Sequence, residues 1–284
     1  MLEQARGYLE DGKPLHAMQM YHRLLREDPH RSTAYVRLAA LYGEMELHRA
    51  AERLLRQGVR SAPRNGELFL SLADVLLAQG RYTQAAHWYG RARIAGQVRT
   101  HYCLALCYVR TGRTAAAERE LRHALRIRPA LPAALELLGE IMILRRQYTR
   151  AIEELREAVK RNPYSGSGHR LLGMALLGAR QTAEALEELH LAVDINPEDA
   201  TAWSLCGDTL IRLRRFPEAE YYLGRALALD PGSADATTSL GYLHLHTGRA
   251  REALEAFEAA LRLHPGHTRA LDGKLHIRLL SHHS

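Results

Sequence analysis

Prolines recur along this chain at a constant interval of 34 residues, and this interval constrains the fold more than any other feature. One series with this spacing contains Pro129, Pro163, Pro197, Pro231 and Pro265, and a second series, two residues out of phase with the first, contains Pro29 and Pro63. The slip lies between Pro63 and Pro129, where the repeat that ends at Gln97 in place of a proline is shorter than the others. A fixed period of this length predicts a stack of similar units rather than one globular core.

Within a unit the apolar residues follow the period of an α-helix twice, as the segment from Ala200 to Pro231 shows. The two helix faces are formed by Trp203, Cys206, Gly207 and Leu210, and then by Ala219, Leu223 and Ala226. Pro217 suits the first turn of the second helix, because the amide that it lacks would have no intrahelical partner there. Pro231 ends that helix, since the residue before a proline is disfavoured in the α region. Each unit is therefore predicted to be a helical hairpin.

Three positions of the unit hold a constant type of side chain. The twentieth position is always alanine: Ala17, Ala51, Ala85, Ala117, Ala151, Ala185, Ala219 and Ala253. The eighth is always small: Ala5, Ala39, Ala73, Ala105, Gly139, Gly173, Gly207 and Gly241. The twenty-fourth is always large: Tyr21, Leu55, Tyr89, Leu121, Leu155, Leu189, Leu223 and Phe257. Small residues facing a large one allow two helices to pack closely, so these three columns are the predicted core.

With this period and these columns, the chain resembles the tetratricopeptide repeat (TPR) family over nearly all of its length. The tryptophan that the family prefers at the fourth position is met by Trp203, while other units have Tyr35, Phe69, His101, Leu135, His169 and Thr237 there. The resemblance implies an all-α fold, a right-handed α–α superhelix of eight helix-turn-helix repeats with a C-terminal capping helix. One solenoid is expected over 1–284, with repeats at 1–30, 31–64, 65–97, 98–131, 132–165, 166–199, 200–233 and 234–267 and the cap at 268–280.

Three local expectations follow from the pattern. The capping helix should turn Leu271 and Leu275 inward to cover the last apolar face. The short repeat that ends at Gln97 should change the superhelical twist at its junction with the next repeat, and the Ser-His-His-Ser end should fray. The first repeat lacks its leading turn, which fits either a natural start or excision from a longer protein.

The sequence offers no catalytic machinery, so the chain is predicted not to be an enzyme and to bind no cofactor or metal. It contains no GxSxG, HExxH or phosphate-binding glycine loop. Its three cysteines, Cys103, Cys107 and Cys206, have no partners at metal-ligand spacing and are interpreted as small packing residues. His244 and His246 are two residues apart and diverge on a helix. Function must therefore come from a surface.

In TPR proteins the first helix of each repeat lines the concave surface at positions two, five, six, nine, twelve and thirteen. We call the residues of this chain at these positions the inner stripe. Its candidate partner-binding members are Arg37, Leu70, Ser71, Asp74, Tyr102, Leu106, Arg110, Glu136, Leu137, Glu140, Arg170, Leu171, Met174, Leu205, Asp208, Arg212 and Tyr242, and it also includes Leu77, Cys103, Ile143, Leu177, Ser204, Ile211, Thr238 and Ser239. It lacks the Lys/Asn/Arg set of chaperone-binding members and the asparagine ladder of glycosyltransferase-linked ones.

The apolar content of the inner stripe favours a protein or peptide partner with an apolar or amphipathic segment, such as a helix laid along the groove. Its carboxylates, Asp74, Glu136, Glu140 and Asp208, would meet basic residues of that partner. The alternative is that tight coiling packs the first helices together and buries the stripe.

Charge is distributed unevenly along the chain. Residues 1–165 contain 27 Lys and Arg against 17 Asp and Glu, whereas residues 166–284 contain 12 against 15. Part of the excess forms a predicted convex basic ridge: Arg53, Arg56, Arg60, Arg119, Arg122, Arg126, Arg156 and Lys160. The ridge could meet an acidic protein, an anionic membrane surface or the acidic half of another copy, or it could simply be a solvated face. Nucleic acid is disfavoured, because no aromatic residues interleave with the arginines.

The predicted function is that of a non-catalytic scaffold or adaptor for protein–protein interaction. Two alternatives stay open: a targeting or substrate-recruiting segment of a larger enzyme or secretion machine, and a self-assembling homo-oligomeric scaffold.

The strong preference for arginine, with Lys13, Lys160 and Lys274 as the only lysines, predicts a GC-rich, bacterial source. With no signal peptide or transmembrane run visible, the predicted location is cytoplasmic, or periplasmic if a leader was removed.

Overall fold

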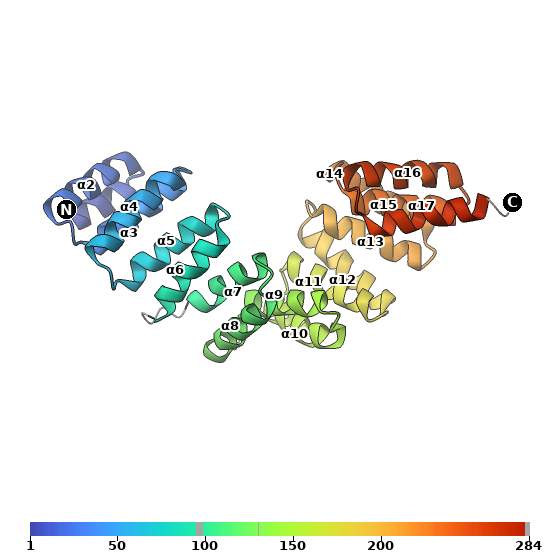
Figure 1. Cartoon of the computed structure of the whole chain (residues 1–284), viewed down its shortest axis with the longest axis horizontal. Coiled ribbons are helices and arrows are strands. Elements are labelled where there is room, and N and C mark those ends of the chain that lie inside the picture. The colour runs from blue at the N-terminus through green and yellow to red at the C-terminus, as the bar shows by residue number, and fades with distance from the viewer. Residues whose placement is uncertain (95–98, 130, 282–284) are drawn as a thin grey trace. The chain divides into compact units, whose positions relative to one another are not determined.

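A computed structural model describes residues 1–94, 99–129 and 131–281 of the chain (Figure 1). These residues form seventeen α-helices and no strand, which confirms the all-α prediction. The helices group into two compact units, Met1–Pro129 (unit 1) and Ala130–Ser284 (unit 2). In the described part of the chain, no helix combines the length and the apolar character that a membrane crossing requires.

Unit 1 is a series of helical hairpins in which each helix packs against the next one along the chain. Its helices are α1 (Leu2–Glu10), α2 (Pro14–Glu27), α3 (Ser32–Glu44), α4 (His48–Ser61), α5 (Gly66–Ala78), α6 (Tyr82–Ile94), α7 (Thr100–Arg110) and α8 (Thr114–Ile127). Odd-numbered helices are the first helices of the repeats and even-numbered helices are the second. The Asn65 side chain caps α5 by accepting hydrogen bonds from two amides of its first turn.

Unit 2 repeats the same arrangement and adds one more helix. Its helices are α9 (Pro132–Leu144), α10 (Tyr148–Arg161), α11 (Gly166–Gly178), α12 (Thr182–Ile195), α13 (Ala200–Arg212), α14 (Phe216–Leu229), α15 (Ala234–His246), α16 (Ala250–Leu263) and α17 (Thr268–Ser281). Ser165, Asp199 and Ser233 cap α11, α13 and α15 with their side-chain oxygens. Pro217 lies in the first turn of α14, as its position in the sequence predicts.

The three columns of constant side chains form the core of both units. All eight alanines of the twentieth position are fully buried, and every member of the eighth and twenty-fourth positions is buried as well. The helices of a hairpin approach closely at the glycines. A Cβ atom on Gly207 would lie only 2.6 Å from Cγ of Leu223, and one on Gly241 would lie 2.7 Å from the Phe257 ring. The small and large columns are therefore complementary surfaces, as predicted.

Each first helix of a complete repeat ends in the same backbone motif. In α13 the amide of Arg214 donates to the carbonyl of Ile211, and the amide of Arg215 donates to that of Leu210. This is the Schellman arrangement, which places the residue at C′ in the left-handed region. The equivalent residues with positive φ are Gly12, Glu46, Gly80, Gly112, Arg146, Arg180, Arg214 and Gly248. The hairpin geometry is thus maintained even where the sequence provides no glycine.

The prediction for the capping helix was wrong about which face is buried. In α17 the buried residues are Ala270, Gly273 and Ile277, while Leu271 and Leu275 are 47% and 57% exposed. The reason is their place in the repeat. Leu271 and Leu275 stand at positions four and eight, which in complete repeats face the second helix of the same hairpin, and α17 is followed by no such helix among the described residues. The face that packs on α16 uses small residues, since the Gly273 backbone lies against the Phe257 ring.

Two expectations fall on residues that the structure does not describe. The altered twist at the short repeat concerns the segment that ends at Gln97, and residues 95–98 lie outside the described ranges. The same holds for residues 282–284 of the expected frayed end.

Candidate functional site

The first helices of unit 2 form a continuous layer. Helices α9, α11, α13, α15 and α17 pack side by side, each on the next (Figure 1). Inner-stripe residues of α11, α13 and α15 lie on the same face, since they line one cavity. In addition, each first helix of a complete repeat packs on the second helix of its own repeat. Residues from three or more repeats can therefore meet on this face.

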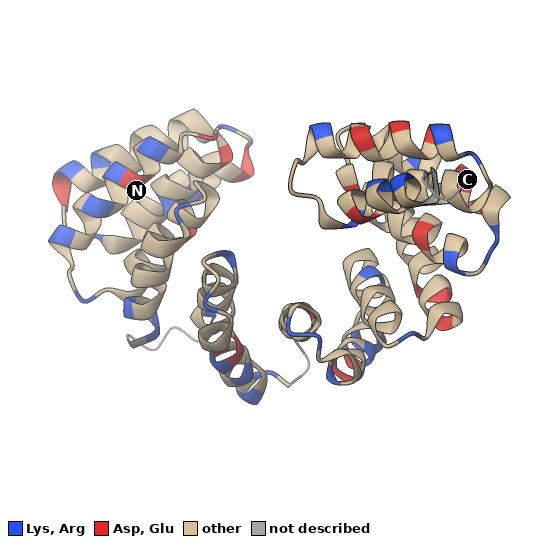
Figure 2. Ribbon diagram, turned by 45° about the vertical axis from the view of Figure 1, so that its right-hand side comes forward, with Lys and Arg blue, Asp and Glu red and all other residues tan. Residues whose placement is uncertain are grey.

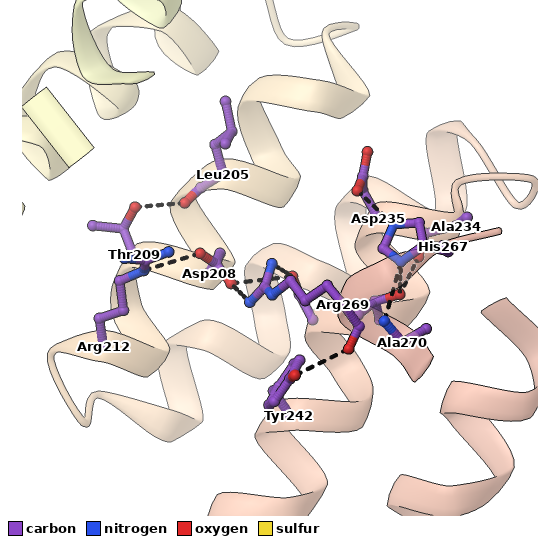
Figure 3. Close-up of polar contacts among 12 residues, drawn as sticks. Leu205, Asp208, Thr209, Arg212, Ala234, Asp235, Tyr242, His267, Arg269 and Ala270 are labelled. Carbon is purple, nitrogen blue, oxygen red and sulfur yellow. Dashed lines mark hydrogen bonds and ion pairs between the residues drawn. The ribbon is translucent and has the colours of Figure 1, made fainter. Parts of the chain in front are cut away.

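Asp208 is the centre of a polar network on this layer (Figure 3). Its carboxylate is paired with Arg212 on its own helix at 3.1 Å and with Arg269 of α17. The hydroxyl of Ser239 on α15 donates to the same carboxylate at 3.3 Å and accepts from the Arg269 guanidinium. Because the Asp208 side chain is 8% exposed, two cations and a hydroxyl are needed to compensate its buried charge. The network joins α13, α15 and α17.

Arg269 is held in place from a second side. Its guanidinium carbon lies 4.9 Å from the centroid of the Tyr242 ring, and the Tyr242 hydroxyl donates to the backbone carbonyl of Arg269 at 3.0 Å (Figure 3). Burial raises the pKa of Tyr242, although the charge of Arg269 acts in the opposite direction. The hydroxyl therefore stays protonated and available as a donor. The Tyr242 ring and hydroxyl thus hold Arg269 from a second side.

A cavity of about 220 Å³ opens beside this network. Its lining combines apolar, hydroxyl and charged side chains from four first helices: Met174, Thr201, Ser204, Leu205, Asp208, Ser233, Asp235, Ser239 and Arg269. Met174 and Leu205 are partly exposed and form its apolar part. Five predicted members of the inner stripe are thus brought together here: Met174, Ser204, Leu205, Asp208 and Ser239.

The remaining stripe residues of unit 2 mostly have partners within the chain. Glu136 accepts hydrogen bonds from the hydroxyls of Ser165 and Ser167, at 2.7 and 2.8 Å. Arg170 is paired with Asp199 at 2.8 Å. Leu137 and Leu171 are buried between neighbouring helices, and Leu171 is only 8% exposed. These two leucines contribute packing rather than accessible surface, while Glu140 is half-buried.

In unit 1 the stripe has a second polar cluster, centred on Asp74 of α5. The Tyr89 hydroxyl donates to this carboxylate at 2.6 Å, and Arg99 is paired with it at 3.1 Å. Burial raises the pKa of Asp74, and the Tyr89 hydrogen bond and the Arg99 charge oppose that rise.

The other predicted stripe residues of unit 1 differ in exposure. Leu70, Ser71, Tyr102 and Leu106 are partly buried, and Arg37 and Arg110 are exposed.

The basic ridge is only partly free to attract anions. Arg56, Arg122 and Arg156 are paired with Glu52, Glu118 and Glu184, respectively. Arg53, Arg60, Arg119, Arg126 and Lys160 are exposed. Unit 1 as a whole contains 21 Lys and Arg against 12 Asp and Glu, and unit 2 contains 18 against 20 (Figure 2). The positive excess therefore belongs to unit 1.

The cysteines are not arranged for chemistry. Cys107 and Cys206 are fully buried, and burial raises the pKa of each thiol to about 12. Burial also raises the pKa of Cys103, which is half-buried near Tyr89 and Arg99. Thiols of this kind are poor nucleophiles at neutral pH, because the reactive thiolate is scarce.

Four residues that line the cavity were absent from the candidate set. Ser233 is the N-cap residue of α15, and Thr201, Asp235 and Arg269 all stand at position two of their repeats. Arg99, which pairs with Asp74, occupies the same position in unit 1. Position two belongs to the inner stripe, so the repeat register could have identified these residues. The pairing of Arg269 with a carboxylate 61 residues earlier depends on the packing of three helices and has no local pattern.

Comparison with known proteins agrees with this architecture. The tetratricopeptide repeat model matches residues 36–98, 102–166, 170–233 and 205–268. No curated protein sequence matches the chain. Among solved structures, one chain of the APC/C hetero-tetramer Cut9–Hcn1 has a TM-score of 0.73 at 16% identity, and the match covers 93% of this chain and 52% of that one. This chain therefore spans about half the length of that relative.

Two further structures are similar over most of their own length. A tetratricopeptide repeat protein from Parabacteroides merdae has a TM-score of 0.67 at 16% identity, with 92% of this chain and 99% of that chain covered. A thermophilic TPR protein from Thermus thermophilus has a TM-score of 0.55 at 26% identity, with 64% and 99% covered. Since the repeat model matches most of the sequence and the hairpins have the same three buried columns, the chain belongs to the tetratricopeptide repeat family.

Proposed function

We propose that this protein is a non-catalytic interaction scaffold and that the inner stripe of unit 2 holds a segment of a partner protein. Membership of the TPR family supports a protein-interaction role in general. The observation that carries the more specific proposal is the cavity beside Asp208, where an apolar patch adjoins a fixed polar network.

The size and lining of the cavity indicate how the partner binds. A volume of about 220 Å³ is below the roughly 300–1,000 Å³ that is common for small-molecule sites. It suits one anchoring side chain of a longer peptide. An apolar anchor would contact Met174 and Leu205, while Ser204, Asp235 and the edge of the Asp208 network would take up hydrogen bonds from the peptide backbone or from basic neighbours.

The polar groups of the site already satisfy one another. Arg269, Ser239 and Asp208 hold their positions through contacts across three helices, so binding costs little side-chain ordering there. Leu137 and Leu171 lie beneath the surface and act by supporting the layer.

The test is partner capture by the full-length protein and by a variant in which Met174→Glu and Leu205→Glu are combined. Proteins from the source organism that bind the immobilised wild type are identified by mass spectrometry. The segment of the partner that binds is then synthesised as a peptide and titrated against both proteins. We expect the variant to bind that peptide at least about tenfold more weakly, because two charges replace the apolar contacts of the anchor. A control variant, Leu191→Glu with Tyr221→Glu, changes exposed apolar residues of α12 and α14 and should bind normally. Equal affinity of the Met174/Leu205 variant and the wild type would place the site elsewhere.

A further inference from the structure

A second and larger cavity, of about 1150 Å³, lies in unit 1 away from the inner stripe. It is formed by the α3–α4 turn, the first half of α4 and the α5–α6 turn. Its lining residues are Glu46, Leu47, His48, Arg49, Ala50, Glu52, Arg53, Arg56, Gln79 and Arg81. Four arginines and two glutamates thus surround one cavity.

Some of these charged side chains join two neighbouring repeats. The Glu52 carboxylate, 13% exposed, is paired with Arg56 at 2.9 Å and with Arg81 of the next repeat at 2.6 Å. Burial alone would raise the pKa of Glu52, but hydrogen bonds from Arg56 and Gln79 and the Arg81 charge hold it below its usual value. The Gln79 side chain also donates to the backbone carbonyl of His48 at 3.3 Å. Glu52, Arg56 and Arg81 therefore have a structural role in joining the repeats.

Arg49 and Arg53 have no such role. Both are exposed, and no ion pair formed within residues 1–94, 99–129 and 131–281 includes either of them. They are four residues apart on α4, so their side chains project from the same face with about 5–6 Å between their Cβ atoms. Like charges at this spacing oppose helix formation slightly. Helix stability therefore does not explain why both are present.

The same inter-repeat bridge occurs elsewhere without the arginine cluster. In unit 2, Arg249 is paired with Glu220 at 3.4 Å, and these two residues occupy the repeat positions of Arg81 and Glu52. The positions equivalent to those of Arg49, Arg53 and Arg56 hold Pro217, Tyr221 and Gly224 in that repeat. The bridge thus requires one glutamate and one arginine. The additional arginines beside the cavity in unit 1 exceed what repeat stacking needs.

We propose that the unit 1 cavity binds a small soluble ligand that carries two or more adjacent phosphoryl groups. Guanidinium groups recognise phosphoryl oxygens through paired, charge-assisted hydrogen bonds. Arg49 and Arg53 supply two unpaired guanidiniums on successive turns, which matches two neighbouring anionic groups better than one. Arg56 and Arg81 share the Glu52 carboxylate, and Arg81 also donates to the side chains of Gln79 and Gln84. Each guanidinium has five N–H donors, so both retain donors for the ligand. The volume leaves room for the rest of such a molecule. This site is independent of the partner groove in unit 2.

The experiment is calorimetric titration of the full-length chain with inorganic tripolyphosphate at constant ionic strength. The test variant is Arg49→Gln with Arg53→Gln, and the control variant is Arg60→Gln with Arg64→Gln. The control removes the same charge from exposed residues of unit 1 that do not line the cavity. We expect the wild type to bind, the test variant to bind at least about tenfold more weakly and the control to change by less than about twofold, because a local site depends on its own cations.

Orthophosphate and sulfate serve as single-group comparators and should bind the wild type at least about tenfold more weakly than tripolyphosphate. Three results would overturn the proposal: no heat of binding with the wild type, equal weakening in the test and control variants, or equal affinity for single and linked phosphoryl groups. Circular dichroism checks the folding of each variant. Should the test variant unfold, the single changes Arg49→Gln and Arg53→Gln provide the same comparison with smaller losses.

Discussion

At the residue scale, the fold depends on the size of a few side chains. Every alanine of the twentieth position is fully buried, and the eighth position admits only glycine or alanine because the large residue of the second helix fills the space above it. Glycine at this position allows the two helices to approach closely. It does not serve backbone freedom here, since these glycines have ordinary helical conformations. Not every helical glycine has this function, as Gly224 shows.

Gly207 and Gly224 provide a matched pair for testing this point. A Cβ atom on Gly207 would lie 2.6 Å from Cγ of Leu223, whereas nothing lies within 4 Å of one on Gly224. Gly207→Ala should lower the free energy of unfolding by about 1–3 kcal/mol through overpacking. Gly224→Ala should raise it by about 0.5–1 kcal/mol, because alanine favours the helix. Urea unfolding followed by circular dichroism measures both, and equal effects of the two changes would contradict the packing argument.

At the element scale, the hairpin turn is specified by backbone geometry more than by residue type. Within the described ranges, eight first helices end with a residue in the left-handed region, but only four of these residues are glycine. The others are Glu46, Arg146, Arg180 and Arg214, at φ values of 57° to 64°. Tertiary packing of the hairpin therefore imposes a conformation that these side chains disfavour on their own.

Replacing one of these residues with glycine should stabilise the protein. Arg214 is exposed and lies at the C′ position of α13, so Arg214→Gly should raise the free energy of unfolding by about 1 kcal/mol. The reverse change, Gly248→Ala at the equivalent place in the next repeat, should lower it by a similar amount. Thermal and urea unfolding measure both effects. A loss of stability in Arg214→Gly would show that the arginine side chain has a stabilising role of its own.

Much of the fold at this scale could be predicted from the sequence, because period and side-chain size are local properties. The three columns, the place of Pro217 and the hairpin pattern all follow from residues in one repeat. The prediction for the buried face of α17 was wrong, because Leu271 and Leu275 occupy positions that are buried in complete repeats. Those positions are buried by the second helix of the hairpin, and no second helix follows α17 among the described residues. The Asp208 network could not be predicted either, because Arg269, Ser239 and Asp208 meet only through the stacking of three helices.

At the scale of the whole molecule, each hairpin contacts mainly its neighbours along the chain, so stability is distributed rather than concentrated in one centre. The two compact units each have their own buried columns and their own polar cluster on the inner stripe. They also differ in charge, with the excess of arginine in unit 1. The two proposed binding sites therefore lie in different units.

This organisation predicts that a destabilising substitution loosens its own hairpin and the neighbouring ones but not distant hairpins. Ala151 on α10 is fully buried, so Ala151→Leu should overpack its hairpin and destabilise it by about 1–3 kcal/mol. Native-state hydrogen exchange should show lost protection in α9 to α12 and little change in α1 to α6. The conservative change Ala151→Ser is the control and should leave most protection intact. Uniform loss of protection in both units would mean that the chain unfolds as one cooperative body.

The exposed leucines of α17 have a practical consequence for engineering. Leu271 and Leu275 stand at positions four and eight, where other repeats receive their second helix. A designed helix with the alanine and leucine columns of α14, joined to α17 by a Schellman turn, would pack on these exposed leucines. The protein could in this way be lengthened by whole hairpins, and each addition would present a fresh surface for selecting new ligands.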